Sequence, residues 1–199
     1  MQQDLLDPSE LFDAVQRCIV DKTSAIVMAE AGNAFAHATG WLHFREAKRY
    51  RASMMVGSIG HMCAGVIGAA LVHGKAVVLT GDGAMLCFNE ISTAVQHQIA
   101  AVWIVLNDAG YNSCIAGQSA RGLDAGGLDI PRVDFEQYAR AMGAQGVRVC
   151  GTAGLDAALD LAMQATGPFV VDAWIRPGES PLRGRFAQFY APTSEQEKA

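Results

Sequence analysis

The sequence predicts an α/β domain with a doubly wound, mainly parallel sheet and helices on both faces. Short apolar, β-branched runs alternate with helix-like segments along nearly the whole chain. Several of these runs are apolar almost without interruption, as strands are when helices cover both faces of a parallel sheet. The 199 residues are enough for one domain with its own core. We therefore expect right-handed βαβ units in a single domain over residues 1–191, with a disordered tail at 192–199.

Five strands are expected from runs that are rich in Val, Ile and other apolar residues. In chain order they are AIVMAE (25–30), AVVLT (76–80), AVWIVL (101–106), GVRVC (146–150) and FVVDAWI (169–175). Each is short enough for a strand and is followed by glycine or polar residues. The basic stretch HFREAKRYR (43–51) has no such pattern and is expected to be a solvated loop.

Four helices are expected from periodicity and capping signals. The first, 9–21, places apolar residues at helical spacing, and the second covers 88–98. The third, 135–142, begins after Asp134, a favourable N-cap residue. The fourth, 155–165, ends just before a Gly-Pro pair.

Charge and cysteine content exclude several classes of protein. The net charge of −5 argues against a protein that binds the phosphate backbone of nucleic acids. Five widely spaced cysteines without a CxxC pair fit neither a disulfide framework nor a zinc site, which favours a reducing compartment. The N-terminus shows no secretory signal, and the apolar run 57–72 is too short to span a membrane. We expect a soluble, cytoplasmic protein that binds neither membrane nor nucleic acid.

Polar turns directly follow two of the predicted strands. Gly81-Asp82-Gly83 follows one strand, and Asn107-Asp108 follows the next. Residues 84–106 separate the turns, enough for one helix and one strand, so both turns can reach the same edge of the sheet. Two carboxylates beside glycines describe a site for Mg²⁺ and a diphosphate. A plain turn accounts for Gly-Asp-Gly as well, and spacing alone leaves both interpretations open.

One connection, GYNSCIAGQSARGLDAGGLDIP (110–131), is unusually long for a compact domain. It follows the second polar turn and is rich in glycine and small polar residues. We expect it to act as a lid that orders when the site is filled.

The motifs resemble those of thiamine diphosphate-dependent enzymes. GDGAMLCF followed by IVLNDAGY resembles the cofactor signature of this superfamily, and GSIGHMCAGVIGAAL resembles the glycine-rich segment that precedes it. PRVDFEQYARAMGAQGVRV and GPFVVDAWI resemble the closing helix and strands of the same domain. The GSIGH wording is more similar to sulfopyruvate and phosphonopyruvate decarboxylase relatives, whereas the PRVDF-to-GAQG stretch is more similar to acetolactate synthases. The resemblance covers residues 25–175 and implies the fold that binds the diphosphate end of the cofactor, with thiamine diphosphate and Mg²⁺ as cofactors.

The resemblance implies three metal ligands. Asp82 and Asp108 would bind Mg²⁺ through their carboxylates, and Gly110 would bind it through its backbone carbonyl. Asp108 departs from the asparagine that is commoner at this position of the family, which adds a negative charge beside the metal and the diphosphate.

The resemblance also implies a set of cofactor contacts. Backbone N–H groups at the start of the helix after the first polar turn would face the diphosphate, and Met62 would support the thiazolium ring. His61 is a possible catalytic residue that could touch the diphosphate or the substrate, although a structural histidine is equally compatible with the sequence. The implied cofactor-binding residues are Asn33, Gly60, His61, Met62, Gly81, Gly83, Ala84, Gly110 and Tyr111.

One residue that the family needs has no counterpart in the motifs. Related enzymes activate the cofactor with a glutamate from a separate pyrimidine-binding domain, and Glu30 and Glu90, the acids nearest the motifs, are unconvincing substitutes. Only 24 residues precede the first predicted strand, which leaves no room for that domain. We therefore expect the diphosphate-binding subunit of a split enzyme, inactive without a pyrimidine-domain partner, with two copies of each subunit as one arrangement.

The expected reaction is decarboxylation of a 2-oxo acid, carboligation of the resulting acyl group, or both. A non-catalytic cofactor-binding or regulatory subunit is the alternative. An ordinary nucleotide-binding domain is disfavoured because no GxGxxG or GxxxxGK[ST] motif follows a strand.

Overall fold

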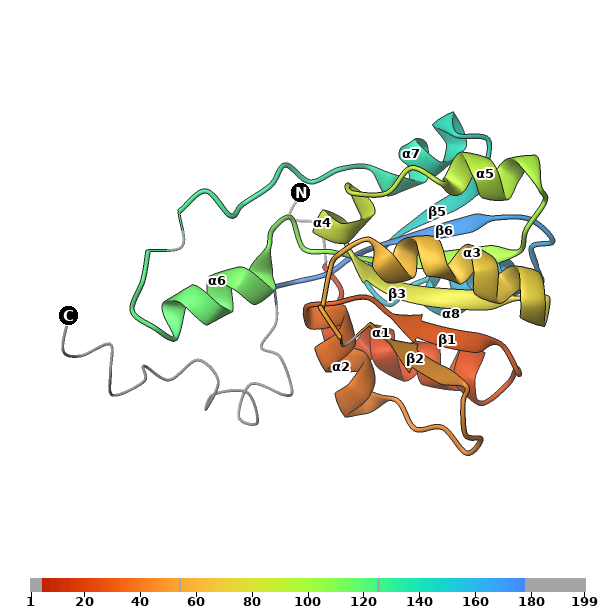
Figure 1. Cartoon of the computed structure of the whole chain (residues 1–199), viewed down its shortest axis with the longest axis horizontal. Helices are drawn as coiled ribbons and strands as arrows, with labels where there is room; N and C mark the ends of the chain where they lie inside the picture. The colour runs from red at the N-terminus through yellow and green to blue at the C-terminus, as the bar shows by residue number, and fades with distance from the viewer. Residues whose placement is uncertain (1–4, 54, 125, 178–199) are drawn as a thin grey trace.

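A six-stranded, wholly parallel sheet forms the centre of the protein, in the order β2-β1-β3-β4-β6-β5 (Figure 1). The computed structural model describes residues 5–53, 55–124 and 126–177. The strands are β1 (Ile26–Ala29), β2 (Tyr50–Ala52), β3 (Ala76–Gly81), β4 (Ala101–Asn107), β5 (Gln145–Cys150) and β6 (Phe169–Trp174). The predicted α/β class and all five predicted strands are confirmed. The predicted tail at 192–199 lies outside the described residues.

Helices cover both faces of the sheet and bury two apolar layers. The first layer lies under α1 (Pro8–Val15), the π-helical turn η1 (Gln16–Val20), α2 (Asn33–Trp41) and α8 (Leu155–Gln164). The second lies under α3 (His61–His73), α4 (Asp82–Met85), α5 (Ile91–Gln96) and α7 (Phe135–Ala141). Successive strand residues alternate between the layers, so Val77 packs in the first and Val78 in the second. No helix in the described part of the chain is long and apolar enough to cross a membrane.

Capping residues fix where several helices begin. Asp7 precedes α1 and forms a capping box, because its side chain accepts from Ser9 N–H while Glu10 accepts from Asp7 N–H. The predicted cap of α7 is confirmed, since the Asp134 carboxylate accepts from Gln137 N–H at 2.9 Å.

Three local predictions need correction. The predicted helix 88–98 is shorter, because α4 begins directly after β3 and stops after one turn, so that α5 starts only at Ile91. The predicted loop 43–51 contains the start of β2, a three-residue edge strand whose polar residues give no strand pattern. The long connection 110–131 contains a further helix, α6 (Asn112–Ser119), which lies beyond the edge of the sheet (Figure 1). Whether this connection closes as a lid stays a prediction.

The order of the strands creates a crevice at the carboxyl ends of β1 and β3. The connection after β1 crosses on the face of α2, whereas the connection back to β3 crosses on the opposite face through α3. The chain therefore leaves the carboxyl end of β1 toward one face of the sheet and the carboxyl end of β3 toward the opposite face. In open parallel sheets, this reversal is the place where ligands bind.

A lysine beneath β3 provides a test of the packing on the α8 side. Lys75 Nζ donates to the carbonyls of Ala162, Met163 and Ala165 at the end of α8, with 2.8 Å to Met163 O. Lys75→Met removes these donors, so we expect a loss of about 1–3 kcal/mol in the free energy of unfolding, measured by denaturant titration. Lys22→Met is the matched control: its ammonium makes an exposed 3.8 Å ion pair with Asp160, and we expect a change within about 0.5 kcal/mol. Equal losses of stability in the two variants would contradict the role of Lys75 in capping the carbonyls at the end of α8.

Candidate functional site

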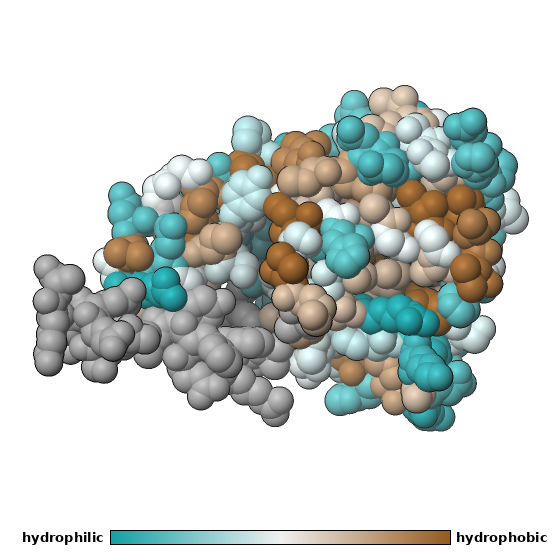
Figure 2. Space-filling view, viewed as in Figure 1, coloured by the Kyte–Doolittle hydropathy of each residue, from teal (hydrophilic) through white to brown (hydrophobic). Residues whose placement is uncertain are grey.

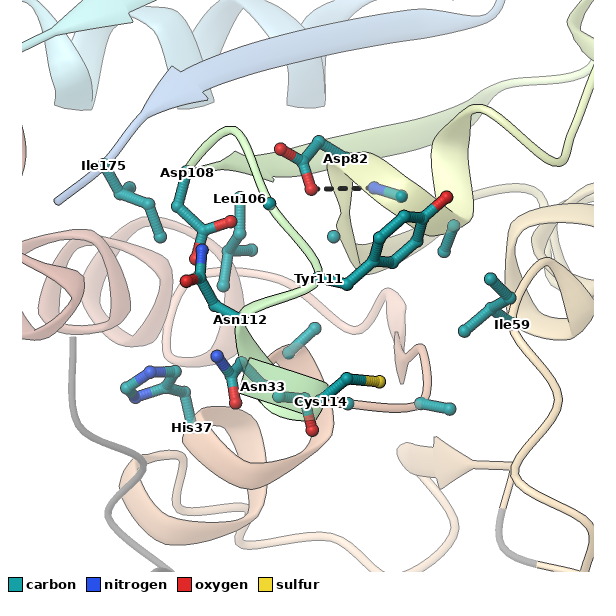
Figure 3. Close-up of a pocket in the computed structure, with 18 of the residues that line it drawn as sticks. Asn33, His37, Ile59, Asp82, Leu106, Asp108, Tyr111, Asn112, Cys114 and Ile175 are labelled. Atoms are coloured by element: carbon teal, nitrogen blue, oxygen red, sulfur yellow. Dashed lines mark hydrogen bonds between the residues drawn. The ribbon is translucent and has the colours of Figure 1, made fainter. Parts of the chain in front are cut away.

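A pocket of about 220 Å³ opens at the carboxyl ends of β1, β3 and β4 (Figure 3). The turn 31–34 forms one wall, the turn 81–84 a second, and residues between 108 and 114 a third. Ile175, just after β6, closes one side. Because β3 and β4 are paired neighbours with Gly81 beside Leu106, both polar turns reach the same edge, as predicted.

Asp82 joins the two polar turns. Its side chain is 3% exposed; Oδ1 accepts from Gly83 N–H and Oδ2 accepts from Ala109 N–H, each at 2.7 Å. Ala109 has a φ of 60°, which is uncommon for a residue other than glycine and is typical of constrained turns at functional sites. This backbone conformation directs the Ala109 N–H toward the carboxylate. The N–H of Gly83 is therefore committed to Asp82 in this structure.

Asp108 faces the same pocket and is electrostatically strained. Burial and the nearby Asp82 carboxylate raise the pKa of Asp108 to about 7, against a hydrogen bond from Asn112 that lowers it. Burial likewise raises the pKa of Asp82, although backbone donors oppose the shift. A half-buried carboxylate whose charge is disfavoured by a buried carboxylate nearby is the electrostatic setting that a bound cation relieves.

The chemistry of the pocket fits Mg²⁺ held together with a phosphate-bearing ligand. Within residues 5–53, 55–124 and 126–177, no cluster of three or more His, Cys, Asp or Glu side chains is placed to hold a metal. Two carboxylates alone do not form a closed cage. Mg²⁺ characteristically takes one or two carboxylates and completes its octahedron with phosphate oxygens and water. The donor set therefore suits a metal that arrives with a diphosphate.

A glycine allows the chain to pass close beneath Tyr111. A Cβ atom added at Gly83 would lie 2.4 Å from Tyr111 Cε1, well inside van der Waals contact. Figure 3 shows the Tyr111 ring above the start of α4, next to Asp82. Any side chain at residue 83 would displace this ring, which explains why the turn carries a glycine.

The structure brings most of the predicted site residues together. Those that line the pocket are Asn33, Gly81, Asp82, Gly83, Ala84, Asp108, Gly110 and Tyr111. The other three lie elsewhere: Gly60 is the N-cap of α3, with a φ of 88°, His61 shares a 2.7 Å hydrogen bond with Ser53, and Met62 is buried in the second apolar layer. Their cofactor contacts stay predictions.

Glu30 has a structural role that the sequence did not reveal. Its side chain is completely buried, and Oε2 accepts from the N–H groups of Met62 and Cys63 at 2.8 and 3.0 Å, at the start of α3. Oε1 accepts from Ala31 N–H at 2.9 Å. The carboxylate thus joins the end of β1 to the positive end of α3 and satisfies N–H groups that the helix leaves without partners.

Replacing this carboxylate by an amide tests the structural role. In Glu30→Gln the new NH₂ group faces an N–H donor on one side or the other, so we expect a loss of about 1–3 kcal/mol in the free energy of unfolding. Glu90→Gln is the control, because Glu90 is exposed and accepts from the neighbouring Asn89 N–H, and we expect a change within about 0.5 kcal/mol. Denaturant titrations that gave an unchanged stability for Glu30→Gln would contradict the role.

Several pocket residues were missed by sequence reasoning. His37 lies one helical turn after Asn33, a spacing that places both on one face of α2. Asn112 follows the second polar turn and bonds to Asp108. Gly57, Ile59, Ser113, Cys114 and Ile175 come from loops or element ends that only the fold brings together.

The family model for the thiamine pyrophosphate enzyme, C-terminal TPP binding domain, matches residues 30–173. A protein of Mycobacterium tuberculosis (strain H37Rv), named as a candidate acetolactate synthase large subunit, is 35% identical over 176 residues, or 86% of this chain and 31% of that relative. The catabolic acetolactate synthase of Raoultella terrigena is 33% identical over 141 residues, or 67% of this chain and 25% of the relative. This chain therefore spans about a third of the relatives' length, or less.

A solved structure shares the fold. The thiamine diphosphate-dependent 4-hydroxybenzoylformate decarboxylase of Rhodococcus jostii RHA1 superposes with a TM-score of 0.78 at 24% identity. The superposition covers 88% of this chain and 34% of that protein.

Proposed function

The chain belongs to the thiamine pyrophosphate enzyme family through its C-terminal TPP binding domain, and on this premise we propose that it binds the Mg²⁺-diphosphate half of thiamine diphosphate in an enzyme acting on 2-oxo acids. One observation carries the proposal: Asp82 and Asp108 come from the ends of two adjacent strands and face one pocket. The reaction is decarboxylation, carboligation, or both, as the names of the similar acetolactate synthases and decarboxylase suggest.

Different residues of the pocket would contact the metal and the diphosphate. Asp82, Asp108 and the carbonyl of Gly110 would bind Mg²⁺, which would supply positive charge for the diphosphate. The N-termini of α2 and α6 both open on the pocket and would offer positive dipole ends to the diphosphate. When bound, thiamine diphosphate supplies an electron sink for cleaving the bond next to a 2-oxo group.

The proton-transfer group that this chemistry needs is absent from the pocket. No glutamate lines the pocket within the described residues, and Glu30 is committed to the start of α3. We therefore propose that a second polypeptide with a pyrimidine-binding domain supplies the activating glutamate. The assembly would pair the two kinds of subunit, with two copies of each as one arrangement.

An apolar surface that runs from the pocket wall along α3 to its far end supports this partner. The helix α3 carries no charged residue other than histidines at its two ends, and Leu71 and Val72 on it are 71% and 76% exposed. Met55 and Val56 are 98% and 88% exposed in the loop that leads through Ile59 into the pocket wall. Figure 2 shows apolar residues along this face of the molecule. A helix that is apolar all round is usually buried, so we propose that the partner covers this surface.

Co-purification followed by a substrate screen tests the proposed function. The chain is expressed together with candidate polypeptides that carry a pyrimidine-binding domain, and CO₂ release is measured over a panel of 2-oxo acids with thiamine diphosphate and Mg²⁺. We expect a stable complex and turnover of at least one 2-oxo acid. A complex that binds neither Mg²⁺ nor thiamine diphosphate would contradict the proposal.

A further inference from the structure

A buried imidazole at one end of the pocket has an atom without a hydrogen-bond partner. His37 is 2% exposed and lines the pocket, and its Nδ1 atom has no partner within the described part of the chain. Buried polar groups are nearly always hydrogen-bonded, so an orphan beside a ligand pocket indicates a bond that forms when the pocket is filled.

The surroundings of His37 hold its ring in place without using this nitrogen. Phe12 and Trp41 pack on the imidazole, with ring centroids 5.4 and 5.8 Å away. Asn33 precedes it by four residues in α2, so the two side chains lie on one face of the helix. Figure 3 shows the Asn33 amide beside the imidazole, and both side chains line the pocket.

We propose that His37 is a positioning residue that acts through Asn33: its Nδ1–H donates to the Asn33 side-chain oxygen and turns the amide NH₂ toward a bound diphosphate. The inference rests on the proposed function, because it takes the diphosphate of the cofactor as the ligand. If Nδ1 instead accepted from the amide NH₂, the Asn33 oxygen would face the anion and repel it. A bound anion therefore selects the state in which Nδ1 carries a hydrogen.

The protonated imidazole always carries that hydrogen, which couples binding to pH. Burial lowers the pKa of His37, against an opposing effect of Asp7. The charged groups that face it are Asp7, which precedes α1 and pairs with Arg176, and Asp108 across the pocket. A nearby diphosphate favours the imidazolium, so binding draws a proton onto His37, and the advantage that His37 gives grows as the pH falls.

The test compares diphosphate affinity in matched variants across pH. His37→Phe keeps a ring between Phe12 and Trp41 but removes both nitrogens. Calorimetric titration with inorganic diphosphate and with thiamine diphosphate, in Mg²⁺, is expected to show about tenfold weaker binding by His37→Phe at pH 6.5. The loss is expected to shrink toward pH 8. Titration of the ligand itself cancels in the ratio of wild type to variant.

A second variant shows whether His37 acts through Asn33. In an Asn33→Ala background the His37→Phe change is expected to have no further effect, because the amide that it orients is gone. Asn33→Ala alone should abolish the same pH-dependent part of the affinity, and it serves as the test if His37→Phe does not fold. The inference would be overturned if the ratio of wild-type to His37→Phe affinity stayed constant across pH. It would also be overturned if the effects of His37→Phe and Asn33→Ala on affinity were additive. Failure of the wild-type chain to bind any diphosphate would instead contradict the proposed function.

Discussion

Replacing Asp82 or Asp108 by alanine is expected to abolish Mg²⁺-dependent binding of thiamine diphosphate. Each change removes one of the two carboxylates that face the pocket, and Mg²⁺ held by one carboxylate and water has little hold on the protein. Calorimetric titration with Mg²⁺, and again with EDTA, measures the effect. Asp108→Asn is expected to be milder, because it keeps an oxygen ligand, removes the repulsion of Asp82 and restores the commoner residue of the family.

Stability must be separated from metal binding in these variants, because Asp82 also accepts from Gly83 and Ala109. Asp172→Asn is the matched control. Asp172 is completely buried in β6 and accepts from Asn107, Phe135 and Trp174, but it does not line the pocket. We expect this variant to lose stability and to keep Mg²⁺-dependent binding. Unchanged cofactor affinity in both alanine variants would contradict a metal site at Asp82 and Asp108.

Cofactor binding and turnover by this chain are expected to depend on a partner polypeptide. The chain alone is expected to bind thiamine diphosphate weakly and to release no CO₂ above background from any 2-oxo acid. The physical reason is that no glutamate lines the pocket within the described residues, and the apolar surface of α3 and residues 55–59 is uncovered. We also expect the isolated chain to self-associate through this surface, which size-exclusion chromatography with light scattering would detect.

A pyrimidine-domain partner is expected to restore turnover. Changing the activating glutamate of that partner to glutamine should then remove most of the activity while the complex stays assembled. If the chain, shown by mass spectrometry to be free of other polypeptides, turned over a 2-oxo acid at an enzyme-like rate, the need for a partner would be disproved.

The sequence predicts the centre of this protein well because the strongest local signals lie there. Continuous apolar runs identify five of the six strands. The two polar turns converge because β3 and β4 are neighbours, which spacing alone made plausible. The resemblance to the thiamine diphosphate enzymes is confirmed by the family match over residues 30–173.

The remaining features depend on contacts between distant parts of the chain. Glu30 appeared to be an acid near the motif, yet the fold uses it to hold the start of α3. The edge strand β2 and the helix α6 lack apolar periodicity, so their sequences resemble loops. His37 enters the pocket only because α2 begins at its wall, and no local pattern distinguishes it from a core histidine.

The position of the bound metal distinguishes a diphosphate-metal site at the ends of β3 and β4 from any other arrangement. Mn²⁺ replaces Mg²⁺ in the presence of thiamine diphosphate, and the loss of backbone amide NMR signals reports which residues lie near the ion. NMR detects weak binding, so the chain can be measured without a partner. We predict selective loss for residues 81–84 and 108–112, with signals from Lys75 and Ile99, at the opposite edge of the sheet, retained. Uniform loss, or loss centred on any other part of the chain, would contradict a diphosphate-metal site at the ends of β3 and β4.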